Sequence, residues 1–105
     1  MTLSEDDIKQ LKSTFPHREI KSSDEAGVTY ILIPAVTLSE KTVDLLFCPG
    51  RSKLYFSEMV PAKVQPNWNE HPVIFAKTWH AFSWRIDHPH QSPIQLIFYF
   101  LRPWR

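Results

Sequence analysis

Residues 28–50, VTYILIPAVTLSEKTVDLLFCPG, are the stretch that decides the fold. The run 28–33 is rich in β-branched and aromatic residues, which predicts a strand, and Pro34 is expected to close it because proline cannot donate to a sheet ladder. The apolar run 43–48 predicts a second strand, which the turn Pro49-Gly50 stops. The residues between the two runs predict a loop through 37–42. A meander is therefore the expected centre of the fold.

The N-terminal residues carry the signals of a helix. Ser4 is a good N-cap, and the three acidic residues after it suit the positive end of a helix dipole. Ile8, Leu11 and Phe15 then repeat at helical spacing until Pro16 ends the pattern. This helix is expected to lie on the sheet.

The rest of the chain extends the meander and then closes it. Residues 17–23 predict a weak strand or connector, 24–27 a turn, 53–60 a third strand, 61–72 a long Pro-rich loop and 73–76 a short strand. The end, SPIQLIFYFLRPWR, fits either a strand or a helix. The pair Ser92-Pro93 favours a helix start. The expected class is α+β: an N-terminal helix, an antiparallel meander of about four strands, a long loop and a C-terminal helix.

Length and charge limit the functions to consider. A chain of 105 residues with a net charge of +1 and no block of like charges predicts one domain, 1–105, without a nucleic-acid or membrane surface. The N-terminus lacks the basic flank and apolar run of a secretory signal, and no run approaches the roughly 18 apolar residues of a membrane span. A cytoplasmic protein without a cofactor is expected.

The single cysteine, Cys48, ends an apolar run and is either a buried thiol or a nucleophile. A nucleophile needs access and a lowered pKa, to which Arg51 and Lys53 could contribute. A thiol in LLFC is more simply a small core side chain.

Residues 78–91, TWHAFSWRIDHPHQ, concentrate aromatic and imidazole side chains. His88 and His90, with His80 or His71, could supply imidazoles to a metal, but Pro89 separates the first two and the spacing matches known ligand patterns loosely. Four residues are candidates for a core or a partner-binding patch, in which Trp and Arg often anchor the contact: Trp79, Phe82, Trp84 and Arg85.

Three stretches resemble the prokaryotic family E of the ubiquitin-conjugating-enzyme-like superfamily. They are TYILIPAVTLSEKTVDLLFCPG, LYFSEMVP and WHAFSW, the last followed by a closing helix in QSPIQLIFYFLRP. The resemblance covers nearly the whole chain and implies a ubiquitin-conjugating-like fold. It also implies a role beside bacterial ubiquitin-like modifiers and their activating enzymes, such as in antiphage defence.

The departures from that family bear directly on mechanism. Familiar conjugating enzymes place the catalytic cysteine in the long segment after the fourth strand, near a His-Pro-Asn element. Residues 61–85 contain no cysteine, and His71-Pro72 is only a partial echo. The resemblance therefore implies a protein without the standard catalytic cysteine, acting as adaptor or scaffold for a modifier or its activating enzyme.

Two alternatives remain open on the sequence alone. The first is an enzyme, either a transferase through Cys48 or a metal-dependent hydrolase through His80, His88 and His90. The second is a small immunity-type binding protein.

Overall fold

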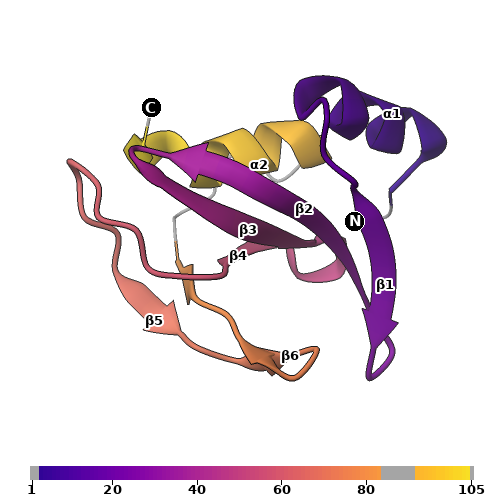
Figure 1. Cartoon of the computed structure of the whole chain (residues 1–105). Coiled ribbons are helices and arrows are strands. Elements are labelled where there is room, and N and C mark those ends of the chain that lie inside the picture. The colour runs from indigo at the N-terminus through magenta and orange to yellow at the C-terminus, as the bar shows by residue number, and fades with distance from the viewer. Residues whose placement is uncertain (1–2, 84–91, 105) are drawn as a thin grey trace.

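The chain forms a four-stranded antiparallel sheet with a helix near each end of the sequence, which confirms the expected α+β class and element order (Figure 1). The computed structural model describes residues 3–83 and 92–104. The elements are α1 (Glu5–Thr14), β1 (Lys21–Glu25), β2 (Val28–Leu38), β3 (Lys41–Cys48), η1 (Pro49–Arg51), β4 (Lys53–Phe56), β5 (Trp68–Glu70), β6 (Val73–Ile74), β7 (Lys77–Thr78), β8 (Ala81–Phe82), α2 (Pro93–Phe100) and η2 (Arg102–Trp104).

Both helices begin where the sequence predicts. The Ser4 side chain accepts a hydrogen bond from the Asp7 amide, and the Asp7 carboxylate accepts one from the Ser4 amide, so the two residues form a capping box. Ser92 and Gln95 repeat this arrangement at the start of α2. The capped Ser92-Pro93 pair thus explains why the ambiguous C-terminal segment is a helix.

The expected end of the strand 28–33 at Pro34 is wrong, because β2 continues to Leu38 through a bulge. The pairing of β2 with β3 shifts register between Ile33 and Val36, so Pro34 and Ala35 stand outside the ladder. The freed Ala35 amide donates to Asp44 Oδ1 at 3.0 Å, and Arg18 Nε donates to the Ala35 carbonyl at 2.9 Å. A bulge is one of the few sheet positions that proline tolerates.

The expected loop through 37–42 is also wrong, since β2 and β3 are joined by a two-residue turn. Leu38 pairs with Lys41, and only Ser39 and Glu40 lie between the strands. The third strand of the prediction is shorter than expected. It ends at Phe56: the Ser57 amide still donates to the Asp44 carbonyl, but the Asp44 amide donates to the Ser57 hydroxyl.

The core lies on both faces of the sheet. Leu11 and Phe15 of α1 and Ile97 and Phe100 of α2 pack on one face, as expected for the N-terminal helix. The segment around β6 covers the other side of the sheet (Figure 1), through Ile74, Trp79 and Ala81. Trp68 of β5 and Phe82 of β8 pack instead with the helix-side residues. Seven buried residues form that second cluster: Tyr30, Leu46, Cys48, Tyr55, Ile74, Trp79 and Ala81.

None of the helices in the described ranges is long and apolar enough to cross a bilayer.

Candidate functional site

Cys48 is a core residue in the structure. It is the last residue of β3, pairs with Lys53 across the ladder and has 0% exposure. Its neighbours are the apolar and aromatic members of the second cluster, and no hydrogen bond to its thiol occurs among the described residues. A thiol without solvent access cannot attack an external thioester, so the geometry matches the structural interpretation of Cys48.

The side chain of His80 contacts that of His71. The sequence related these two residues only as possible metal ligands. Backbone hydrogen bonds of 2.7 and 2.8 Å join His80 to Phe56 of β4, and the two imidazole Nδ1 atoms lie 2.8 Å apart. Such a contact requires one Nδ1 to donate and the other to accept. Burial lowers the pKa of His80, and the His71 ring lowers it further. His80 therefore favours the neutral state.

No metal cluster is present in the described part of the chain, where no group of three His, Cys, Asp or Glu side chains is placed to hold an ion. Two of the proposed metal ligands, His88 and His90, lie outside the described residues. The same holds for Trp84 and Arg85 of the proposed contact patch.

Trp79 and Phe82 lie on opposite faces of the sheet and do not form one patch. Trp79 is 4% exposed in the second cluster, and its indole Nε1 donates to the Ile74 carbonyl at 3.0 Å. Phe82 is fully buried on the helix side, where its ring lies 5.5 Å from Phe56 and 5.1 Å from Trp68. Both side chains pack in the core, and neither offers an open contact surface in this conformation.

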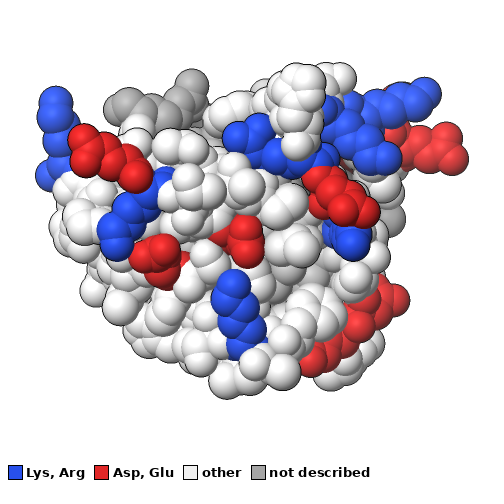
Figure 2. All heavy atoms as spheres, in the orientation of Figure 1, with Lys and Arg blue, Asp and Glu red and all other residues white. Residues whose placement is uncertain are grey.

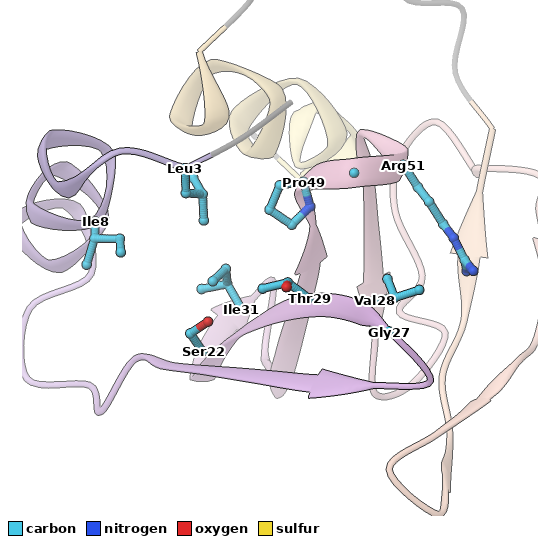
Figure 3. Close-up of a pocket in the computed structure, with 10 residues that line it drawn as sticks. Leu3, Ile8, Ser22, Gly27, Val28, Thr29, Ile31, Pro49 and Arg51 are labelled. Atoms are coloured by element: carbon cyan, nitrogen blue, oxygen red, sulfur yellow. The ribbon is translucent and has the colours of Figure 1, made fainter.

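A groove of about 610 Å³ lies beside the start of α1 (Figure 3). We call it the α1 groove, and it is lined by Leu3, Ile8, Ser22, Gly27, Val28, Thr29, Ile31, Pro49, Gly50 and Arg51. Ser22 pairs with Ile31, and Thr29 lies two residues before Ile31 on β2, so these three lining residues share the helix face of the sheet. The deep contacts of α1 come from Leu11 and Phe15, which leaves the sheet beside the first turn open.

The lining of the α1 groove is mostly apolar and suits the binding of another molecule. Figure 3 shows Leu3, Ile8 and Ile31 pointing into the space between α1 and β2, with Arg51 extending along the far end beside Val28. Among its described lining residues there is no carboxylate, imidazole or thiol, and Arg51 carries the one charge. A hydrogen bond with Tyr55 raises the pKa of Arg51, so its guanidinium stays charged. An apolar floor with one cation suits a protein segment or an amphipathic ligand.

The sequence did not reveal this groove, because its lining comes from α1, β1, β2 and η1. The two-residue spacing of Thr29 and Ile31 predicts that both side chains lie on one face of a strand. It does not predict that the space beside α1 stays open. The charge prediction is consistent with the face shown in Figure 2, where acidic and basic side chains are interspersed.

Comparison with family models, with curated proteins and with solved structures gives no match to this chain.

Proposed function

We propose that the protein is a conjugating-enzyme-like adaptor of a bacterial ubiquitin-like modification pathway, which binds the modifier or its activating enzyme without forming a thioester. The observation that carries this proposal is the zero exposure of Cys48 within β3. Thioester exchange requires a thiolate that can reach the incoming acyl group. The one sulfur able to form a thioester is enclosed by packed side chains.

The layered architecture supports the same proposal. The elements follow the order that the sequence resemblance implies: an N-terminal helix, a four-stranded meander, a long Pro-rich segment and a C-terminal helix. The position that would carry a catalytic cysteine falls in or after the long segment, and residues 57–83 hold none. His71 and His80, the imidazoles of that segment, are engaged with each other.

The α1 groove is the surface that we assign to the partner. It combines the half-buried apolar side chains of Leu3, Ile8 and Val28 with one exposed cation at its end, as a protein interface with a polar rim requires. Thr29 lines the groove from β2 and is exposed, so it can be enlarged without disturbing the core. Thr42 of β3 is equally exposed and is not among the residues that line the groove.

The test is a charging and binding experiment with a cognate modifier, its activating enzyme and ATP. The proposal predicts complex formation with either partner, no adduct that a thiol reductant removes, and an identical result for Cys48→Ser. Thr29→Lys should abolish binding while Thr42→Lys leaves it unchanged. A reducible adduct that disappears in Cys48→Ser would show a catalytic role and overturn the proposal. Absence of any complex with both partners would refute the pathway itself.

A further inference from the structure

A second groove, of about 290 Å³, lies on the opposite face of the sheet from the α1 groove. It separates strands β1 to β3 from the β6–β7 hairpin. We call it the aromatic groove, and it is lined by Lys21, Ser23, Tyr30, Leu32, Asp44, Leu46, Phe75, Lys77 and Trp79. Its volume is at the lower end of the range of ligand sites, about 300–1,000 Å³, and fits one long side chain.

The aromatic groove already holds an ammonium group, that of Lys77. The Lys77 Nζ atom lies 4.9 Å from the Trp79 ring centroid and 3.7 Å from Asp44 Oδ2. An aromatic face combined with a nearby carboxylate is the arrangement by which proteins recognise alkylammonium groups. Trp79 keeps only 4% exposure beneath this lysine, so another ammonium can reach the ring only when Lys77 moves away.

A strained turn positions Phe75, the third aromatic residue of the lining beside Trp79 and Tyr30. Phe75 and Ala76 join β6 to β7 with φ of 52° and 58°, in the region that Asn-Gly adopts readily and a bulky side chain adopts at a cost. The Phe75 amide donates to Glu25 Oε2 at 2.8 Å, which fixes the turn against β1. The Phe75 ring lies 5.6 Å from that of Tyr30 and remains 39% exposed. Strain of this kind points to a role for the side chain that it positions.

We propose that the aromatic groove binds an alkylammonium group, the side chain of a lysine on a partner protein, and that Lys77 occupies the site in the free protein. Trp79, Tyr30 and Phe75 supply the aromatic surface, and Asp44 supplies the counter-charge. The second lysine in the lining, Lys21, lies 3.5 Å from the carboxylate of Glu19, which offsets its repulsion of a bound cation. This site is independent of the α1 groove and of the proposed pathway.

The test uses three small probes: acetyl-lysine methylamide, its Nε-trimethylated form and the neutral acetyl-norleucine methylamide. Each is titrated into the full-length, isotope-labelled chain while the Trp79 indole N–H and the Phe75 amide are followed by NMR. The proposal predicts saturable shifts at both groups with either cation and none with norleucine. Equal shifts with norleucine would show a merely apolar groove and overturn the proposal.

Occupation by Lys77 is tested by Lys77→Ala, with Lys41→Ala as the matched control because Lys41 pairs with Glu58 outside the groove. If Lys77 fills the site about two thirds of the time or more, its removal tightens cation binding at least about threefold, since affinity scales with the fraction of open sites. Lys41→Ala should have no effect. Unchanged affinity in Lys77→Ala would refute the occupation by Lys77.

The role of the strained turn is tested by Phe75→Asn and Ala76→Gly. Both residues fit a positive φ, so neither variant should lower the melting temperature. Phe75→Asn should weaken cation binding about two- to fivefold through loss of one ring, whereas Ala76→Gly should bind like the wild type. If Phe75→Asn bound the cation as tightly as the wild type, the Phe75 ring would not be part of the binding site. Asp44→Asn, which keeps an oxygen for the Ala35 amide, should also weaken binding.

Discussion

Trp79→Ala should lower the free energy of unfolding by about 3–5 kcal/mol, the usual cost of truncating a buried aromatic side chain. Trp79 is 4% exposed among the residues of the second cluster, and its indole N–H donates to the Ile74 carbonyl. The variant therefore loses apolar contacts, leaves a cavity and orphans one acceptor of the β6–β7 hairpin. Since a domain of this size is stable by about 5–15 kcal/mol, Trp79→Ala should be close to the limit of folding.

The assay is urea unfolding and thermal melting, both followed by circular dichroism because removing a tryptophan changes the fluorescence signal itself. A loss of 3 kcal/mol or more should lower the melting temperature by at least about 12 °C in a domain of roughly 100 residues. Val64→Ala is the control, since Val64 is 67% exposed and its truncation should change stability by less than about 0.5 kcal/mol. If Trp79→Ala melted like the wild type but lost partner binding, Trp79 would be an interface anchor and the packing argument would fail.

Three further predictions concern titration and backbone geometry. Because the pKa of His80 is lowered in the folded state, the unfolded chain binds more protons at this residue. The free energy of unfolding should therefore fall as the pH drops from about 6.5 through the folded pKa. Urea midpoints measured across this pH range should show the slope, and His80→Gln should flatten it. Gly27→Ala should cost about 1–2 kcal/mol in thermal melts through its φ of +78° alone, since nothing lies within 4 Å of the added methyl group; an unchanged melt would contradict this backbone geometry. Ser92→Ala should cost about 1 kcal/mol in urea unfolding by removing the N-cap of α2, and a neutral result would contradict the capping account.

Local signals made the helices predictable, whereas the bulge of β2 depends on residues far along the chain. Ser4 and Ser92 act within three residues of themselves, so their capping motifs can be read directly from the sequence. A proline such as Pro34 ends a strand when the backbone amide of the residue after it finds no other hydrogen-bond acceptor. Here Asp44, nine residues later than Ala35, accepts that amide and lets the strand continue.

The candidate sites were harder to predict because tertiary packing assembles them. Trp79 and Phe82, which the sequence predicts as members of one patch, are three positions apart in an extended segment and lie in different core clusters. The pairing of His71 with His80 was not predictable from either residue's immediate neighbours, because it depends on how the segment turns at Pro72. The two grooves likewise combine strands that only the register of the sheet brings together.

Reaction of the Cys48 thiol with a chromogenic disulfide reagent, in buffer and across a urea gradient, tests the central claim most directly. A sulfur enclosed in β3 should react only through opening of the sheet, so the rate should be slow in buffer and should rise along the unfolding transition. Stoichiometric reaction of the native protein within seconds, before any loss of structure, would show an accessible thiol and contradict the assignment of a non-catalytic adaptor.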